Sequence, residues 1–296
     1  MKLCISIILL LAANIVFGQV NYLVYQVKGK AWKTTDKLHK TLKIGQLLNN
    51  TESIKVSTKS SVVLICENYS TITLNQNQDY LLSQYEDSCI KNDHSLTADY
   101  FKFMWDELSN PDISPETDRR KYMGSNVGAV ERGLPDIIID SSIDTINNYS
   151  GNLFIRWKSI LAPSRISLAV YDSNKNGQLL FSAPTKNYSI SLDTIRKYAV
   201  GKTAVYWVIK KDSKEIGERK MIRFWPKEAY DSYCTNLQNS FIPDRESAEW
   251  YYMLGFCLEA NHFLAEAYQN YKKAMQLNPQ EKRYQRTVEN IKKAYF

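Results

Sequence analysis

Few residues of this 296-residue chain combine a reactive type with a spacing that supports catalysis. The 3 histidines, His39, His94 and His262, are far apart and lack the spacing of metal ligands. Gly201-Lys202-Thr203 matches the last residues of a phosphate-binding loop, but Arg196 stands where that loop needs glycine. The patterns GxSxG, HExxH and GxGxxG do not occur. We therefore expect a protein that is not an enzyme and that binds no cofactor or metal.

Two clusters of charged residues could bind ions, but each has a simpler interpretation. Asp136, Asp140 and Asp144 lie four residues apart, whereas a calcium loop needs closer alternation, a glycine and a closing glutamate. Residues 119–121, Arg-Arg-Lys, could attract an anion, yet acidic residues stand beside them. We interpret the first cluster as a solvated strand edge and the second as a solvated face.

Length and charge bound the organisation of the chain and its partners. A chain of 296 residues with 44% hydrophobic residues can form more than one core, because single cores rarely grow beyond about 250 residues. We expect two or three domains. The 38 Lys and Arg residues exceed the 31 Asp and Glu residues, which gives a net charge of +7. No long basic run of the kind that follows nucleic acid occurs, so we expect no nucleic-acid partner.

The first 18 residues have the features of an export signal. Lys2 gives a positive start, residues 5–17 are apolar apart from one serine and one asparagine, and Val16-x-Gly18 is a small-residue cleavage site. The apolar run is shorter than the roughly 20 residues that span a bilayer. We expect a signal peptide over residues 1–18 and no transmembrane segment in the mature protein. Its expected location is the periplasm or another part of the envelope.

The cysteines favour one disulfide. Besides Cys4, the chain contains Cys66, Cys89, Cys234 and Cys257. The first two of these four lie in one β-rich segment, and a bond between them would stabilise it by about 3 kcal/mol in the chain-entropy model. The alternative is two buried free thiols. Because an oxidising compartment permits the bond, we predict it between Cys66 and Cys89. Cys234 and Cys257 fall in helical patterns, where we expect core residues.

Residues 19–108 are expected to form a β domain with a helix after it. Short segments of alternating apolar residues are separated by turns about every ten residues, which is typical of strands. Over residues 26–84, the succession VKGKA, LKIGQLL, ESIKV, SSVVLI, ENYSTITL and DYLLSQ resembles the FecR-type domain, an extracytoplasmic β-rich module. The transmembrane helix and cytoplasmic tail of FecR regulators are not recognisable, so we do not expect direct control of a sigma factor. Residues 95–110 have the apolar periodicity of a helix docked on this domain.

A linker and a second β domain are expected next. Residues 109–135 contain three prolines, three glycines and many charges, which indicates a linker or long loop. Residues 136–226 contain about seven short alternating segments, as in a β-sandwich. The order FIRW, LAVYD and then VYWVI after the Gly201 turn resembles a fibronectin type III or immunoglobulin-like domain. Trp157 and Trp207 are expected core residues, with a sugar-stacking platform as the alternative.

The last segment, residues 227–296, has helical periodicity. Residues 227–241 and 280–295 are expected to be flanking helices. Between them, residues 248–281 resemble a tetratricopeptide repeat, a 34-residue helix-turn-helix unit. The residues that carry this resemblance are Tyr251, Leu254, Gly255, Leu258 in place of the usual tyrosine, Ala267, Tyr271, Ala274 and Pro279.

Packing explains these residue types. Gly255 and Ala267 are expected where two antiparallel helices touch and no larger side chain fits, and Ala274 where the next helix approaches. Tyr251 and Tyr271 are expected to fill the space between layers. A lone repeat is too small to satisfy itself, since about three repeats are needed to bury a continuous core. Either the flanking helices and the sandwich cover its apolar faces, or a protein partner does.

We expect a protein partner to contact side chains that line these helices. Tyrosines are among the residue types that dominate binding energy at protein interfaces. Pro226 and Pro243 mark changes of periodicity, so we further expect the β domains to fold without residues 244–296. The predicted contacts are Tyr251, Tyr252, Asn261, Tyr268 and Tyr271.

Together these features predict a multidomain fold of β plus α class. It comprises an N-terminal all-β domain, a central β-sandwich and a C-terminal helical unit. The combination resembles envelope proteins of Bacteroidetes-type bacteria, which implies a non-catalytic, exported adaptor or sensor that binds a protein. The alternatives are a module that binds carbohydrate or cell wall, and a hydrolase whose site is assembled from distant residues.

Overall fold

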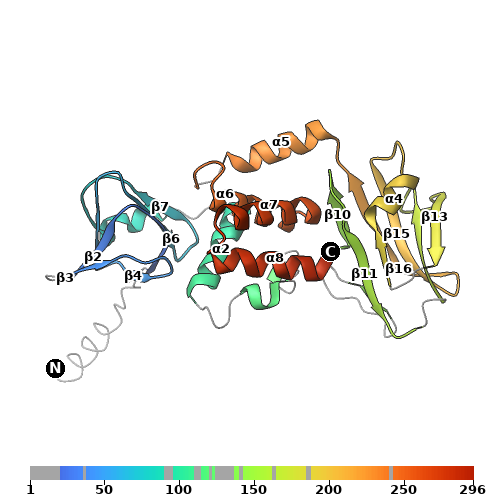
Figure 1. Ribbon diagram of the computed structural model, residues 1–296, viewed down its shortest axis with the longest axis horizontal. Coiled ribbons are helices and arrows are strands. Elements are labelled where there is room, and N and C mark those ends of the chain that lie inside the picture. The colour runs from blue at the N-terminus through green and yellow to red at the C-terminus, as the bar shows by residue number, and fades with distance from the viewer. Residues whose placement is uncertain are drawn as a thin grey trace, which may run out of the picture. The chain divides into compact units, whose positions relative to one another are not determined.

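The computed structural model describes residues 21–35, 38–89, 96–109, 115–119, 122–123, 137–139, 143–161, 165–184, 188–239 and 243–296. The chain divides into two compact units, residues 1–114 and 115–296. β-Sheets form the first unit, and β-sheets followed by helices form the second (Figure 1). The predicted multidomain fold of β plus α class is therefore confirmed. The export signal expected over residues 1–18 lies outside the described residues.

The strands of the first unit form two antiparallel four-stranded sheets. One sheet has the order β4-β1-β6-β7 and contains β1 (Asn21–Lys28), β4 (Leu47–Asn49), β6 (Ser61–Cys66) and β7 (Thr71–Leu74). The other has the order β3-β2-β5-β8 and contains β2 (Ala31–Thr35), β3 (Leu38–Thr41), β5 (Ser53–Val56) and β8 (Asp79–Leu81). They are followed by the 3-10 helix η1 (Leu82–Ser88) and helix α2 (Leu96–Ser109).

Both faces of β1 are covered. One face contributes to a core shared by the two sheets, where the Tyr22 hydroxyl donates to the carbonyl oxygen of Leu82 at 3.1 Å. On the other face, the Tyr25 ring packs edge-on against Tyr100 and Phe101 of α2, with ring centroids 6.3 and 5.4 Å apart. The apolar face of α2 therefore packs on the β-sheet of its own unit, as its periodicity predicts.

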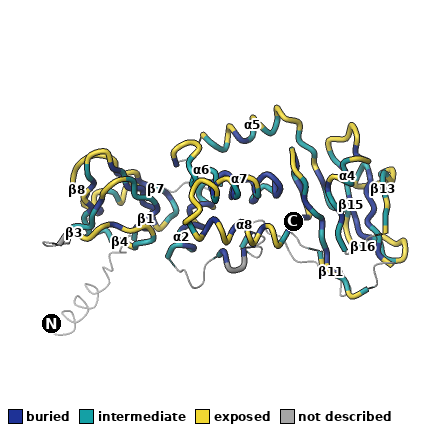
Figure 2. Tube along the Cα trace, viewed as in Figure 1, coloured by how far each residue is buried: buried dark blue, intermediate teal, exposed yellow. Residues whose placement is uncertain are grey.

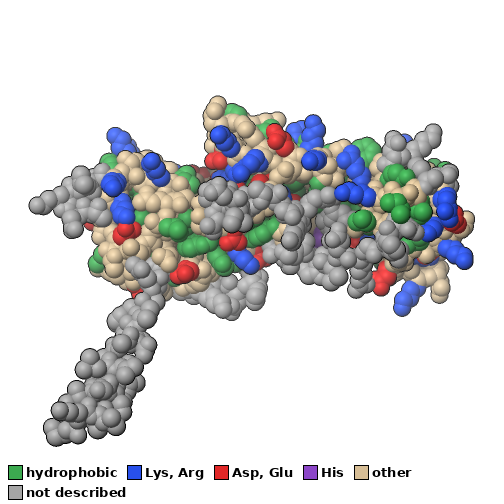
Figure 3. All heavy atoms as spheres, turned by 90° about the horizontal axis from the view of Figure 1, so that it is seen from below, with side chains coloured by type: hydrophobic (Ala, Val, Ile, Leu, Met, Phe, Trp, Pro, Cys, Tyr) green, Lys and Arg blue, Asp and Glu red, His purple; other side chains and the backbone are tan. Residues whose placement is uncertain are grey.

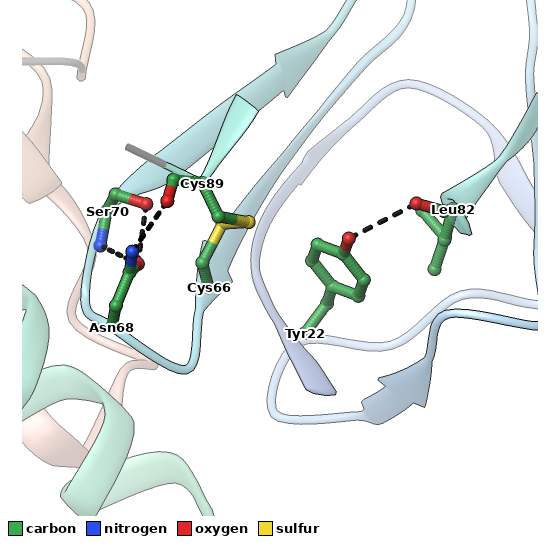
Figure 4. Close-up of a disulfide and its surroundings, with 6 residues drawn as sticks. All are labelled: Tyr22, Cys66, Asn68, Ser70, Leu82 and Cys89. Carbon is green, nitrogen blue, oxygen red and sulfur yellow. Dashed lines mark hydrogen bonds between the residues drawn. A yellow bond between two sulfur atoms is a disulfide. The ribbon is translucent and has the colours of Figure 1, made fainter. Parts of the chain in front are cut away.

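Cys66 and Cys89 form the expected disulfide, which ties the end of β6 to the residue after η1 (Figure 4). Asn68 supports the same junction, because its side-chain nitrogen donates to the carbonyl oxygen of Cys89 at 2.7 Å. The side-chain oxygen of Asn68 accepts from the backbone nitrogen and hydroxyl of Ser70 at 3.1 and 2.7 Å. The disulfide therefore links two segments of the N-terminal β unit to each other.

The second unit begins with a short 3-10 helix and two sheets. The helix is η3 (Pro115–Asp118). The first sheet has the order β10-β16-β15-β12-β13 and contains β10 (Thr145–Asn148), β12 (Ile166–Tyr171), β13 (Leu179–Pro184), β15 (Ala204–Lys211) and β16 (Lys214–Phe224). The second has the order β14-β11-β9 and contains β9 (Ile137–Ile139), β11 (Phe154–Ser159) and β14 (Ser189–Ser191). β10 runs parallel to β16, and the other pairs are antiparallel.

The central β region also contains a helix that strand periodicity does not predict. α4 (Leu192–Tyr198) begins after Ser191, whose hydroxyl accepts from the backbone nitrogen of Asp193 and caps the helix. Trp157 and Trp207 are 5% and 0% exposed, which confirms them as core residues. They present no free ring face on which a sugar could stack.

Four helices complete the second unit, at the positions that helical periodicity predicts. They are α5 (Lys227–Gln238), α6 (Ala248–Ala260), α7 (Leu264–Leu277) and α8 (Lys282–Tyr295). Most of α6 is buried, whereas α8 alternates buried and exposed residues (Figure 2). No helix in the described part of the chain is both long and apolar enough to cross a bilayer.

Candidate interaction site of the helical region

Helices α6 and α7 form a close hairpin around one glycine. An ideal Cβ placed on Gly255 of α6 would lie 2.8 Å from both Cδ1 and Cε1 of the Tyr271 ring on α7. Real Cβ atoms do not approach another atom so closely. This confirms that no larger side chain fits at Gly255. Ala267 and Ala274, also expected at close helix contacts, are both fully buried.

Helix α8 packs on α6 through polar contacts at their first turns. Arg283 lies with Nη2 2.9 Å from Oε2 of Glu249, and its guanidinium carbon is 5.0 Å from the ring centroid of Tyr252. The Tyr252 hydroxyl in turn lies 3.1 Å from the Thr287 hydroxyl. Arg283 is only 8% exposed and Thr287 is fully buried, so these contacts belong to the interior of the helical region.

A buried ion cluster joins η3 and Arg119, the residue after it, to three helices. Nε and Nη2 of Arg119 donate to Oε2 of Glu259 on α6 at 3.0 and 2.7 Å. Nη2 also donates to the Tyr271 hydroxyl on α7 at 2.6 Å, and that hydroxyl donates to Glu259 at 2.8 Å. Nη1 donates to the Glu116 carboxylate. Asn290 of α8 donates to the carbonyl oxygen and Oε1 of Glu116 at 2.9 and 3.0 Å.

The charges of this cluster are almost completely removed from water. Glu116 is 1%, Arg119 3% and Glu259 6% exposed. Burial raises the pKa of Glu116, and repulsion from Glu259 adds to the increase, while Arg119 and Asn290 oppose it. Burial alone would lower the pKa of Arg119, but the two carboxylates hold it well above its ordinary value. Arg119 is therefore a permanent cation shared between two carboxylates.

The helices also dock on the sheet. The backbone and side-chain nitrogens of Asn147, in β10, donate to the carbonyl oxygens of His262 and Asn261 at 3.0 and 2.8 Å. Glu266 of α7 is 4% exposed, and its Oε1 accepts from the backbone nitrogens of Tyr149 and Ser150, both at 2.7 Å. Burial raises the pKa of Glu266, against these two hydrogen bonds.

An aromatic cluster surrounds Phe263, in the turn between α6 and α7. Phe263 is 1% exposed, and its ring centroid lies 5.1, 5.6 and 5.3 Å from those of Trp225, Tyr230 and Tyr233. Trp225 follows β16, and the two tyrosines belong to α5. Part of the cover of the α6–α7 hairpin is therefore supplied by other segments of the same chain. The expectation that the β domains fold without residues 244–296 stays a prediction. Removing these residues would uncover this cluster and the contacts of Asn147.

The structure separates the five predicted partner contacts into two groups. Tyr252 and Tyr271 are fully buried, so the prediction that they contact a partner directly is wrong in this conformation. Their rings fill the space between the helices instead. Tyr251, Asn261 and Tyr268 are half-buried and keep part of their surface exposed. Only these three remain available to a partner.

The three half-buried residues, Tyr251, Asn261 and Tyr268, lie outside the buried ion cluster and make other contacts. Tyr268 stacks on Phe296 with ring centroids 4.3 Å apart, and Nζ of Lys272 lies 5.6 Å over the Tyr268 ring. Tyr251 packs edge-on against Trp250 at 4.9 Å. The side chain of Asn261 donates to the carbonyl oxygen of Cys257 at 2.9 Å and thus helps to end α6.

Sequence reasoning missed the residues of the ion cluster. Arg119 was expected on a solvated face, and this interpretation is wrong because its guanidinium is buried against Glu259 of α6 and Tyr271 of α7. One signal was present in the sequence: Glu259 is a charged residue inside an apolar helix. A buried charge needs a partner, so Glu259 predicts a buried cation. The sequence does not indicate which of the 38 Lys and Arg residues supplies it.

The other chemically suggestive residues do not assemble into a reactive site. Asp144 pairs with Lys220, and Nζ of Lys202 lies 3.4 Å from the Asp172 carboxylate. Asp136 and Asp140 lie outside the described residues. Within the described ranges, no group of three or more His, Cys, Asp or Glu residues is arranged to hold a metal ion. Described Lys and Arg side chains on the face in Figure 3 are dispersed, with acidic side chains among them.

No family model matches the chain, and no curated protein matches it. The class of the molecule is therefore defined by its structure alone. It has N-terminal antiparallel β-sheets, a mixed β region and C-terminal helices that close around a buried ion cluster.

Proposed function

We propose that this chain is an exported, non-catalytic adaptor or sensor that binds a protein partner in a bacterial envelope through its helical region. The observation that carries the proposal is the hairpin of α6 and α7, with Gly255 against Tyr271 at positions where a tetratricopeptide repeat has small and aromatic residues. Such helical units present surfaces to other proteins. On this proposal, the β units are a FecR-like domain and an immunoglobulin-like sandwich.

Export is supported by the leader over residues 1–18 and by the disulfide. The bond between Cys66 and Cys89 is consistent with an oxidising compartment. Intact mass of the protein purified from its native source tests this part of the proposal. We expect a mature chain that begins at or near Gln19. A population that retains Met1 throughout would contradict export by a cleaved leader.

The proposed contact surface lies around the half-buried aromatic residues of the hairpin. Tyr268 and Phe296 stack on each other and Lys272 lies over the Tyr268 ring, which places a cation beside an aromatic pair. Tyr251 lies on α6. Aromatic side chains that retain accessible surface supply a large contact area at a small loss of side-chain entropy.

Co-purification with site variants tests partner binding. The full chain is crosslinked in envelope fractions, isolated, and compared with Tyr251→Ala and Tyr268→Ala. We expect one protein at fixed stoichiometry with the wild type and at least a tenfold loss of it with the variants. The matched control is Tyr198→Ala, because Tyr198 is 50% exposed on α4 and lies outside the helical region. Equal recovery with all four proteins would refute the proposal.

A further inference from the structure

The turn that contains Glu116 and Arg119 packs against α6, α7 and α8 through these two side chains. The helix groups that it contacts, on Glu259, Tyr271 and Asn290, are called the receptor groups. Both side chains come from the short segment at the start of the second unit, far from the helices in sequence. Their partners come from three different helices: Glu259 on α6, Tyr271 on α7 and Asn290 on α8. The helices thus supply an anion, an aromatic hydroxyl and an amide that converge on one turn.

The receptor groups suit a guanidinium better than an ammonium. Two nitrogens of Arg119 donate to the Glu259 carboxylate, and its guanidinium carbon lies 5.0 Å from the Tyr271 ring centroid. The planar fork of arginine can make these contacts simultaneously, whereas lysine offers a single, strongly hydrated charge. Glu116, three residues earlier, accepts from the third nitrogen.

The receptor groups are held by contacts that do not involve the turn. Tyr271 packs against Gly255, and α8 is joined to α6 through Arg283 and Glu249. The hydroxyl of Tyr271 donates directly to Glu259 at 2.8 Å, which orients the carboxylate. These contacts can persist when the arginine side chain is absent. A site formed in advance is what ligand exchange requires.

We propose that α6, α7 and α8 form a binding site for an arginine side chain presented on an acid-x-x-arginine turn, and that Glu116 and Arg119 are its built-in ligand. The site takes an external segment of the same chemistry when the chain's own arginine is absent. A protein partner that presents such a turn competes with residues 115–119 for the helices. The inference does not depend on the surface around Tyr251 and Tyr268.

Chemical rescue of the full chain tests the guanidinium specificity. The variant Arg119→Ala retains Cβ, so N-ethylguanidinium replaces the atoms that the substitution removes. We expect millimolar N-ethylguanidinium to raise the unfolding midpoint of Arg119→Ala and to leave the wild type unchanged. Ethylammonium should require at least a tenfold higher concentration. Equal effects of the two cations, or no effect of either, would overturn the proposal.

A labelled peptide of residues 113–123 tests recognition of the turn. We expect saturable binding to the Arg119→Ala chain, at least tenfold weaker binding when the peptide carries lysine in place of its Arg119, and no binding to the occupied wild type. The control is the double variant Arg119→Ala with Glu259→Gln, which lacks the receptor carboxylate and leaves no unpaired charge at position 259. Binding to this control, or none to Arg119→Ala, would overturn the proposal.

A third variant keeps the inference testable if Arg119→Ala does not fold. Arg119→Lys retains the charge but not the planar fork. We expect its folding equilibrium constant to be at least tenfold lower than that of the wild type, because a lysine cannot reach Glu259 with two nitrogens and Glu116 with a third. Wild-type stability of Arg119→Lys would show that the site recognises charge alone and would overturn the proposal.

Discussion

Substitution of Gly255 by alanine probes the contact between α6 and α7. The new methyl group would lie 2.8 Å from two carbons of the Tyr271 ring and 3.1 Å from Cζ. The ring cannot retreat easily, because its hydroxyl is held between Arg119 and Glu259 at 2.6 and 2.8 Å. Either the helices separate, or the ring moves and breaks a buried hydrogen bond.

Two opposing effects decide the magnitude. Alanine is about 1 kcal/mol better than glycine within a helix. Overfilling a packed core typically costs about 1–3 kcal/mol. The Tyr271 ring is held by hydrogen bonds at its hydroxyl and by packing against Gly255 at its edge. The cost of overfilling this contact should therefore lie in the upper part of that range. We therefore expect Gly255→Ala to lower the free energy of unfolding of the second unit by about 1–2 kcal/mol.

Hydrogen exchange of peptides from α6 and α7 measures this change locally, which matters because the chain has two compact units. The control is Ser232→Ala at an exposed position of α5, where the change should stay within about 0.5 kcal/mol. In the Tyr271→Phe background, where the ring is no longer held by its hydroxyl, the cost of Gly255→Ala should fall. Stabilisation by Gly255→Ala of about 1 kcal/mol, the propensity gain alone, would refute the close contact.

Three further predictions concern the ion cluster, the aromatic cluster and the disulfide. The folded-state pKa of Glu116 is raised above its unfolded value, so its stabilising contribution is present below about pH 4.3 and is lost as pH rises through the folded pKa. Urea unfolding should therefore show that the wild type loses stability relative to Glu116→Gln as pH rises from about 4.3 through the folded pKa. A relative gain in stability would mean that Arg119 dominates and lowers the pKa of Glu116. Phe263→Ala should destabilise the second unit by about 3–5 kcal/mol, because the ring fills a buried aromatic cluster; hydrogen exchange of α5 and α7 that matches the wild type would contradict this. Replacing Cys66 and Cys89 by serine should cost the first unit about 3 kcal/mol, measured by thermal unfolding against the second unit as internal control; an unchanged first transition would count against a structural role.

Local patterns predicted most of the secondary structure. Strand alternation in residues 21–81 and helical periodicity in 227–295 arise from one-sided burial, which leaves a repeating signature in the sequence. Gly255 was also predictable, because a glycine inside an apolar helix indicates a close approach of another element.

The missed features depend on contacts between distant residues. β10 is the polar four-residue segment TINN, and it joins the sheet by pairing in parallel with β16. Local periodicity does not predict such a long-range pairing. Arg119 stands among charged neighbours in the sequence and resembles a solvated residue, but it is buried by its contacts with α6 and α7. Tyr252 and Tyr271 have the residue type of interface contacts, but their burial follows from how three helices pack, which the spacing of tyrosines does not specify.

Protection of the helical region upon partner binding tests the central claim most directly. Once a partner has been captured at fixed stoichiometry, hydrogen exchange of the full chain is compared with and without it. The account predicts that slowed exchange is concentrated in peptides of α6 and α7 that contain Tyr251 and Tyr268 and is absent in the Tyr251→Ala, Tyr268→Ala double variant. Protection confined to the β-sheets of either unit, with α6 and α7 unchanged, would contradict it.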